Sequence, residues 1–350
     1  MIPDRVRDAF LGQATACAEL DSPFMAQLMT LCATRPWPDS PVTKRIFEWQ
    51  GDLYPSGQSV PLRLAGALHA CKLAGDPELT AVYPPRQGDP DKIWDAVCAA
   101  LLQHCTAINA HLDQAPQTNE VRRSAVLIAV GHMLAERFHL PIRLSELGAS
   151  AGLNLHWDDY ALAIGKQQFG AALPALKLRP DWTGPPPPTT PPTVVVRAGV
   201  DLNPLELPRD AQRLQSYLWA DQPHRITLTR AAMAVAQTKV VKADAIDWLE
   251  TALAHTPGQL HLIYSTVAWQ YFPRDKQITG TALIEQAGLT ATAETPMAWF
   301  TMETDGTTPG AALTLRLWPG DITIALGRAD FHGRWVQWYH QDTPNKATQT

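Results

Sequence analysis

A short run of small residues after a predicted strand is the most informative segment of the chain. The strand, expected over 142–147, carries Glu146 near its end and leads into Gly148-Ala149-Ser150-Ala151-Gly152. Small residues let a backbone approach a ligand closely, and a helix expected after this loop, through about Ile164, would present free N–H groups. The pattern predicts a ligand site at the end of the strand.

Two acidic side chains end the next two predicted strands. Asp201 ends the strand expected over 193–201, where a carboxylate can accept hydrogen bonds from both hydroxyls of a ribose. Asp244 ends the strand expected over 239–244, where it can face an adenine amino group. Each signal alone is weak, because a strand-end aspartate is more often a helix cap or turn residue. The ordered set is stronger, since open α/β sheets bind ligands at the carboxyl ends of their strands.

Predicted strands alternate with helical segments after Pro141, which indicates a mostly parallel sheet covered on both faces. The last two strands are close enough in sequence to form an antiparallel hairpin, which is ordinary for a methyltransferase and unusual for a dehydrogenase. The expected fold is therefore α/β and Rossmann-like, of the class I methyltransferase type, behind an all-helical domain. The strand candidates are 142–147, 193–201, 239–244, 260–265, 298–303, 312–318 and 322–329.

The Pro-rich segment 180–192 is expected to be an extended connector with few hydrogen bonds. As an insertion it would explain why Gly152 and Asp201 are 49 residues apart, where about 20 are typical of a dinucleotide fingerprint. The expected division of the chain is a helical domain over 1–115, a Rossmann-like domain over 116–342 with a Pro-rich insertion over 165–193, and a disordered tail over 343–350.

The first 140 residues show helical patterns and no convincing strand. Over 93–112, apolar residues recur with the i, i+3, i+4, i+7 spacing of one buried helix face. Another helix is expected to open at Ser59. A third is expected after Thr118 or Asn119 as its N-cap, with Glu120 in the first turn.

Composition excludes several classes of protein. Hydrophobic residues make up 45% of the 350 residues, enough for buried cores in about two domains. The net charge of −5, without a run of Lys or Arg, argues against nucleic acid as a partner. No signal peptide or membrane span is expected, so we predict a cytoplasmic protein. The five cysteines form no CxxC pair and the histidines show no ligand spacing, so no disulfide framework or metal is expected.

Six segments spread along the chain form a recognisable set: Gln117–Ser124, Glu146–Leu155, Gly199–Leu205, Asp244–Leu249, Tyr264–Val267 and His332–Trp335. They resemble a bacterial family known as domain of unknown function 2332, and the resemblance covers roughly residues 10–340. The second half is in turn similar to class I S-adenosylmethionine-dependent methyltransferases. That similarity implies the cofactor S-adenosylmethionine.

The resemblance to methyltransferases also implies roles for the strand-end residues. Glu146, Gly148 and Gly152 would shape the methionine end of the cofactor site, Asp201 would hold the ribose and Asp244 the adenine. Ser150 stands where a middle glycine is common in such loops. The residues expected to bind the cofactor are Glu146, Gly148, Ala149, Ser150, Gly152, Asp201, Leu202, Asn203, Asp244, Ala245 and Ser265.

Methyl transfer needs little covalent machinery, because the sulfonium is already activated and catalysis aligns an acceptor and excludes water. No catalytic residue is therefore assigned, and the acceptor is expected to be a small molecule. Helix capping explains Asn119 and Glu120 at least as well as a role in binding. The residues expected to contact the acceptor are Asn119, Glu120, Arg123, Asn154, Tyr264, Trp269 and Tyr271.

Two alternatives stay open from the sequence. The loop also reads G-x-S-x-G, the nucleophile elbow of α/β-hydrolases, and Ser150, Glu303 and His332 could complete a triad. A helical region before the elbow disfavours that hypothesis, which also leaves the strand-end acids without a task. A non-catalytic nucleoside-binding protein is the other alternative, suggested by Ser150. An NAD-dependent oxidoreductase is disfavoured because the loop lacks G-x-G-x-x-G.

Overall fold

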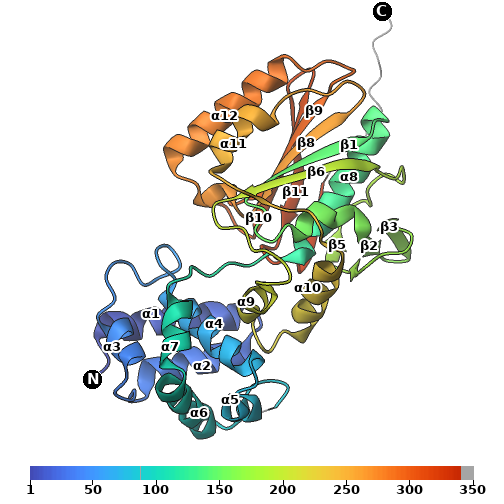
Figure 1. Cartoon of the computed structure of the whole chain (residues 1–350). Coiled ribbons are helices and arrows are strands. Elements are labelled where there is room, and N and C mark those ends of the chain that lie inside the picture. The colour runs from blue at the N-terminus through green and yellow to red at the C-terminus, as the bar shows by residue number, and fades with distance from the viewer. Residues whose placement is uncertain (87, 340–350) are drawn as a thin grey trace, which may run out of the picture. The chain divides into compact units, whose positions relative to one another are not determined.

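The computed structural model describes residues 1–86 and 88–339. By their internal contacts, these residues divide into two units (Figure 1). The first comprises Met1–Thr118 with Arg209–Thr227, and the second comprises Asn119–Pro208 with the chain from Leu228 onward. Whether 1–115 and 116–342 fold as independent domains stays a prediction, and the tail predicted over 343–350 lies outside the described residues.

The first unit is built from short helices, as the pattern of the first 140 residues predicts. Five of them begin with a proline in the first turn, where its missing N–H has no intrahelical partner to lose. Their apolar faces share one core that includes Phe10, Leu28 and Leu64. The helices are α1 Asp4–Glu19, α2 Pro23–Thr34, α3 Pro41–Phe47, α4 Val60–Leu73, α5 Pro77–Val82, α6 Pro90–Gln103, α7 Cys105–Leu112 and α9 Ala211–Ser216.

The single helix expected over 93–112 is in fact two. The chain breaks at His104 (φ −109°, ψ 24°), which ends α6 and precedes α7. The His104 imidazole lies 2.7 Å from a carboxylate oxygen of Asp76, the N-cap of α5. An apolar period continues across such a break because both helices pack on the same core.

The second unit is a mixed α/β structure around a large, mostly parallel sheet, as predicted. Its strand order is β5-β12-β11-β10-β9-β8-β1-β6-β7. The pairs from β7 to β9 are parallel, and the pairs from β9 to β12 are antiparallel. The strands are β1 Ile142–Leu147, β5 Asp181–Thr183, β6 Val194–Asp201, β7 Val241–Lys242, β8 Leu260–Thr266, β9 Met297–Glu303, β10 Ala311–Trp318, β11 Ile322–Ala329 and β12 Trp335–Trp338.

Helices lie on both faces of this sheet (Figure 1). On one face, α11 and α12 share a core with strand residues such as Leu147, Val200 and Ile263. On the other lies α8, whose Gly131 leaves room for the ring of Trp157. These helices are α8 Ser124–Phe138, α11 Ala245–Ala252 and α12 Arg274–Leu289. A further helix, α10 Pro223–Val235, has residues in both units. No helix of the described residues is long and apolar enough to cross a membrane.

The strand predictions hold best where the strand is buried. The prediction for 142–147 coincides with β1, and the predicted hairpin is the antiparallel pair β10–β11. The strand expected over 239–244 is reduced to Val241–Lys242, an edge strand that pairs only with the end of β6. The prediction missed β12, which extends the hairpin.

The helix expected through Ile164 is wrong. A 3-10 segment, Leu153–Asp159, follows the small-residue loop and is kinked at His156, and strand β2, Ala161–Ile164, comes next. Strand β2 pairs with β3, Gln167–Gly170, and β4, Lys177–Leu178, in a small second sheet. Tertiary contacts override local preference here, since the Tyr160 hydroxyl donates to the Leu153 carbonyl and closes the segment on itself.

The Pro-rich connector is also better bonded than expected. Its strand β5 pairs in parallel with β12, and the Asp181 N–H donates to the Arg334 carbonyl at 2.9 Å. The ring of Trp182 lies 5.4 Å from the ring of Trp338. A tryptophan just before the proline run therefore anchors the segment to the sheet edge.

Candidate functional site

The candidate site lies where the sheet changes its direction of winding. Strand β1 has β6 on one side and β8 on the other, both parallel to it. The chain passes from β1 to β6 and β7 first, and it later returns on the other side through β8 and β9. The loops after β1 and β8 therefore leave the same edge on opposite sides, which is where open α/β sheets bind ligands.

The small-residue loop turns tightly through three left-handed residues, Gly148 (φ 77°), Ser150 (φ 54°) and Gly152 (φ 73°). Its N–H groups are largely used within the protein. Those of Gly148 and Ala149 donate to the Val200 carbonyl at 3.0 Å, and that of Gly152 donates to the Ala149 carbonyl at 2.7 Å. The expectation of free N–H donors at a following helix is therefore wrong, because no such helix forms and the loop closes on itself.

Asp201 fixes this loop from the end of β6. One carboxylate oxygen accepts the Ser150 N–H at 2.9 Å, and the other accepts the Asn203 N–H at 2.8 Å. Leu202 and Asn203 are exposed, while Asp201 is half-buried. An ionised carboxylate has about four acceptor positions, so Asp201 keeps capacity for further hydrogen bonds on its exposed side.

Asp244 adopts the alternative role that the sequence allowed, that of a helix cap. It accepts the Ile246 and Asp247 N–H groups at the start of α11 and forms an ion pair with Lys276 at 3.2 Å. Burial alone would raise the pKa of Asp244, but these hydrogen bonds and the Lys276 ammonium lower it overall. Asp244 is half-buried, and the next residue, Ala245, is buried.

Glu146 is the most unusual side chain of the site. It is 2% exposed, and its Oε2 has no hydrogen-bond partner among the described residues. In the sheet it lies beside Gly199 of β6 and Tyr264 of β8. Burial, and then the nearby charge of Asp201, raise the pKa of Glu146 well above its usual value, although Arg123 and Tyr264 oppose this. A buried, unsatisfied carboxyl group at a sheet edge is typical of a functional site.

The segment before α8 closes the site from one side. The Asn119 side chain accepts the Leu153 N–H at 2.9 Å, and Glu120 accepts the Arg122 N–H. Glu120 therefore caps the 3-10 turn Val121–Arg123 that precedes α8, so the N-cap expected at Thr118 or Asn119 is wrong. Asn119 instead fixes the end of the small-residue loop.

Arg123 and Asn154 connect this segment to the strand ends. Arg123 donates to the carbonyls of Thr266 and Phe331, both at 2.8 Å. Asn154 accepts a hydrogen bond from the Ser124 hydroxyl at 2.7 Å, and the Tyr264 hydroxyl donates to the Asn154 carbonyl at 3.1 Å. The structure thus brings Asn119, Glu120, Arg123, Asn154 and Tyr264 together around the ends of β1 and β8.

Several residues expected to contact a ligand are fully enclosed. Tyr264 and Ser265 have no exposed surface, and Asn154 has 1%. These three side chains therefore support the residues around the site and do not face solvent. Trp269, by contrast, is half-buried and Tyr271 is 70% exposed. Both lie in the 3-10 turn Trp269–Tyr271 after β8.

Glu303, at the end of β9, positions that turn and has a structural role that the sequence did not indicate. Its carboxylate accepts the Ala268 and Trp269 N–H groups at 3.0 Å and the Gln270 N–H at 3.3 Å. Burial raises the pKa of Glu303, and these hydrogen bonds only partly offset it. The signal available in the sequence was an acidic residue at the end of a predicted strand, the same signal that singled out Asp201 and Asp244.

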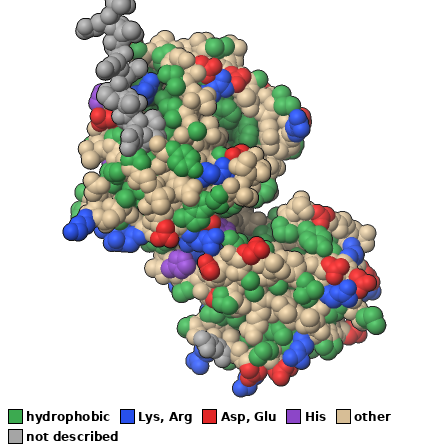
Figure 2. Space-filling model, turned by 180° about the vertical axis from the view of Figure 1, so that it is seen from behind, with side chains coloured by type: hydrophobic (Ala, Val, Ile, Leu, Met, Phe, Trp, Pro, Cys, Tyr) green, Lys and Arg blue, Asp and Glu red, His purple; other side chains and the backbone are tan. Residues whose placement is uncertain are grey.

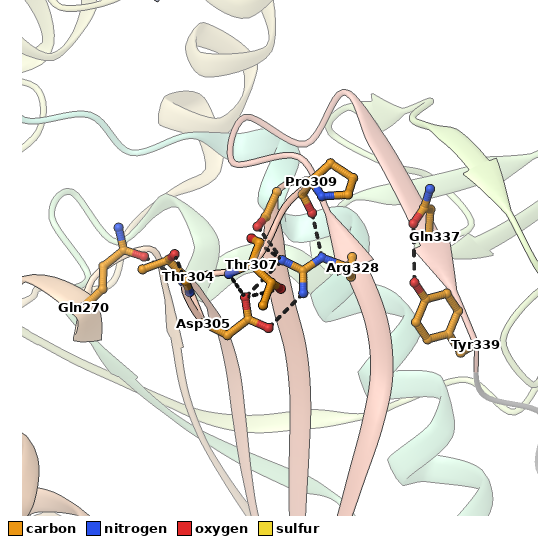
Figure 3. Close-up of polar contacts among 10 residues, drawn as sticks. Gln270, Thr304, Asp305, Thr307, Pro309, Arg328, Gln337 and Tyr339 are labelled. Atoms are coloured by element: carbon orange, nitrogen blue, oxygen red, sulfur yellow. Dashed lines mark hydrogen bonds and ion pairs between the residues drawn. The ribbon is translucent and has the colours of Figure 1, made fainter.

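The loop after β9 lies next to the turn after β8 and is held by its own polar contacts (Figure 3). Gln270 accepts the Thr304 N–H at 2.9 Å, which joins the loops after β8 and β9. Arg328 forms an ion pair with Asp305 at 2.9 Å and donates to the Pro309 carbonyl. Beyond them, the Tyr339 hydroxyl donates to Gln337 at 3.4 Å. The guanidinium of Arg328 is thus used to hold the loop.

The geometry disfavours the hydrolase arrangement. The Ser150 hydroxyl is buried and has no hydrogen-bond partner among the described residues, whereas an activated nucleophile needs a base within hydrogen-bond reach. The Glu303 carboxylate is occupied by three backbone N–H groups. Ser150, Glu303 and His332 therefore do not form a hydrogen-bonded triad in this structure.

We expect Gly148→Ala to destabilise the loop. A Cβ at this position would lie 2.5 Å from the Cβ of Ala268, in a left-handed conformation that side chains rarely adopt. The expected loss in the free energy of unfolding is about 1–3 kcal/mol, measured by urea denaturation. Gly165→Ala is the matched control, because it also has a positive φ but nothing lies within 4 Å of its added Cβ. Equal losses in the two variants would contradict the close packing of Gly148 on Ala268.

Sequence comparison identifies a family but no characterised relative. The family model described as "Uncharacterized protein conserved in bacteria (DUF2332)" matches residues 7–338. The chain belongs to this family. No match was found among curated proteins or among solved structures. Membership in DUF2332 therefore covers both units, and the activity has to be argued from the site itself.

Proposed function

We propose that this DUF2332 protein is an S-adenosylmethionine-dependent methyltransferase that acts on a small-molecule acceptor. The observation that carries the proposal is the meeting of Glu146, the small-residue loop and Asp201 at the point where the sheet reverses its winding. The order β7-β6-β1-β8-β9 corresponds to the 3-2-1-4-5 order of doubly wound nucleotide-binding sheets. On this basis we interpret the second unit as Rossmann-like.

The residues present fit such a cofactor at two places. Glu146 offers a buried oxygen without a partner at the end of β1, where a cationic amino group could bind. Asp201 offers its exposed side to ribose hydroxyls while its inner side holds the loop. When bound, S-adenosylmethionine supplies an activated methyl group, so the protein has to bind, orient and exclude water.

The acceptor would be bound on the side of the site formed by the turn after β8. Tyr271 presents an exposed aromatic ring there, and Trp269 is partly exposed beside it. Glu303 holds this turn through its backbone, so the two rings sit on a fixed support. The proposal assigns binding and orientation to these aromatic side chains and names no general base.

A non-catalytic nucleoside-binding protein is the second candidate. The observation that favours it is that the N–H groups of Gly148, Ala149, Ser150 and Gly152 all donate within the protein. This leaves few backbone donors for the charged end of a cofactor. In that case, an adenosine would bind at Asp201 without transfer of a methyl group.

Titration calorimetry of the full chain with S-adenosylmethionine, S-adenosylhomocysteine and adenosine tests both candidates. The methyltransferase proposal expects saturable binding of the first two compounds, and weaker binding of adenosine, which lacks the methionine end. Equal affinity for all three would favour the non-catalytic candidate. Absence of binding of all three would overturn both, and labelling of Ser150 by a fluorophosphonate would favour the hydrolase.

The face shown in Figure 2 agrees with a small-molecule partner rather than a nucleic acid. Lys and Arg side chains are interspersed there with Asp and Glu side chains. The chain as a whole carries a net charge of −5. Nucleic-acid surfaces instead concentrate positive charge to neutralise several phosphates.

A further inference from the structure

Three polar side chains that the proposed function does not use gather inside the helical unit. They are His111 of α7, Arg213 of α9 and Tyr217, which directly follows α9. The rings of His111 and Tyr217 lie 5.0 Å apart. The helix α4 approaches them through Gly66, where an added Cβ would lie 2.6 Å from the Tyr217 ring and 3.1 Å from Nε2 of His111.

Two nitrogens of this cluster lack a hydrogen-bond partner. Nε of Arg213 and Nε2 of His111 are both buried and unpartnered among the described residues. The Tyr217 hydroxyl donates to the Gln114 carbonyl at 3.3 Å. Buried polar atoms are almost always satisfied in folded proteins, so two unpartnered nitrogens in one cluster indicate a missing acceptor.

The charge of Arg213 is also without a counter-ion. No carboxylate of the described residues forms an ion pair with it, whereas Arg209 in the same segment pairs with Asp210 at 2.8 Å. A second cation lies close by, since the charge of Arg63 acts on Tyr217 as that of Arg213 does. An oxyanion would provide both a counter-charge and hydrogen-bond acceptors for this guanidinium.

We propose that Arg213 and His111 bind an oxyanion, a phosphate or carboxylate group, within the helical unit, next to Gly66 of α4. The guanidinium fork matches two oxygens of such a group, and the imidazole can donate to a third or to a shared oxygen. Tyr217 packs on the imidazole and fixes its orientation. The site lies wholly within the helical unit and does not depend on the proposed methyltransferase activity.

The electrostatics agree with this arrangement. Burial, and then the charge of Arg213, lower the pKa of His111 to about 4. At pH 7 the imidazole is therefore neutral, and the tautomer with hydrogen on Nε2 is a donor for an anion. Burial raises the pKa of Tyr217, so its hydroxyl stays protonated and adds no negative charge to compete with the ligand.

Titration of the full chain with inorganic phosphate, and separately with acetate, at constant ionic strength and pH 7 tests the proposal. We expect saturable binding of phosphate, of acetate or of both, and the preferred probe identifies the group. Arg213→Gln should weaken binding about tenfold or more, because it removes both the positive charge and the fork of N–H donors that would hold the anion. Gly66→Ala should weaken it as well, because the added methyl group would lie 2.6 Å from the Tyr217 ring and would displace Tyr217 and His111 from their present positions.

Arg209→Gln is the matched control, since it removes one positive charge from the same segment but from a guanidinium that already has a carboxylate partner. It should bind the probe like the wild type. Circular dichroism confirms folding of each variant, and Arg213→Lys, which keeps the charge, should bind with intermediate affinity. The proposal is overturned if the wild-type chain binds neither probe, if Arg213→Gln and Gly66→Ala both bind like the wild type, or if Arg209→Gln is weakened as much as Arg213→Gln.

Discussion

Replacing Asp201 with alanine is expected to lower the free energy of unfolding by about 2 kcal/mol and to abolish binding of S-adenosylmethionine. The carboxylate holds the Ser150 N–H, and Ser150 is only 4% exposed, so water cannot easily replace the lost acceptor. A buried N–H without a partner costs about 1–3 kcal/mol. The Asn203 N–H is at an exposed residue and can bond to water instead. Urea denaturation and titration calorimetry measure the two effects.

Asp201→Asn separates the effect on stability from the effect on binding, and Asp181→Asn is the control. The first keeps one acceptor oxygen and removes the charge, so it should recover part of the stability while binding of the cofactor stays weak. The second removes a carboxylate at an exposed residue of the edge strand β5 and should match the wild type in both measurements. Wild-type affinity in Asp201→Ala would contradict the assignment of the ribose to Asp201.

Glu146→Gln is expected to gain stability relative to the wild type as the pH rises. Because burial and Asp201 raise the pKa of Glu146 in the folded protein, the folded state keeps a proton that the unfolded state has lost. The wild type should therefore lose about 1.4 kcal/mol per pH unit between the unfolded pKa of about 4.3 and the raised folded pKa. Glutamine does not titrate, so the variant lacks this loss. The measurement is urea denaturation of both proteins from pH 4 to pH 8.

The difference in the free energy of unfolding between Glu146→Gln and the wild type isolates the titration of Glu146, since all other groups titrate in both proteins. Glu250→Gln, at an exposed position of α11, is the control and should show a constant difference from the wild type over the same range. In an Asp201→Asn background the difference should begin to level off at a lower pH, because one cause of the raised pKa of Glu146 has been removed. A difference for Glu146→Gln that does not change with pH would show that Glu146 is ionised without penalty in the folded protein.

The helices and buried strands were predictable because their signals are local. The period of the apolar residues located α4 and, as a single helix, α6 and α7, and short segments with apolar residues located β1, β8 and β9. The short spacing between β10 and β11 indicated their hairpin. The order of acidic residues at strand ends followed from the same strand predictions, so the sequence also located the edge of the sheet at which the candidate site lies.

The partners of polar atoms were not predictable, because they come from residues far apart in the chain. Nothing near Ser150 indicates that its N–H bonds to Asp201, and nothing near Leu153 indicates that its N–H bonds to Asn119. These two bonds help to replace the expected helix with a closed loop and a 3-10 segment. For the same reason the unpartnered nitrogen of Arg213, close to His111, is visible only in the folded helical unit.

The sequence by itself thus determined the elements and their order along the chain, whereas the tertiary structure decided what each polar side chain does. Asp201 and Asp244 are alike in sequence, since both end a predicted strand, yet one fixes a loop and the other caps a helix. The physical reason is that apolar periodicity depends on neighbours within a few residues, while hydrogen bonds and charges depend on whatever the fold brings within about 3 Å.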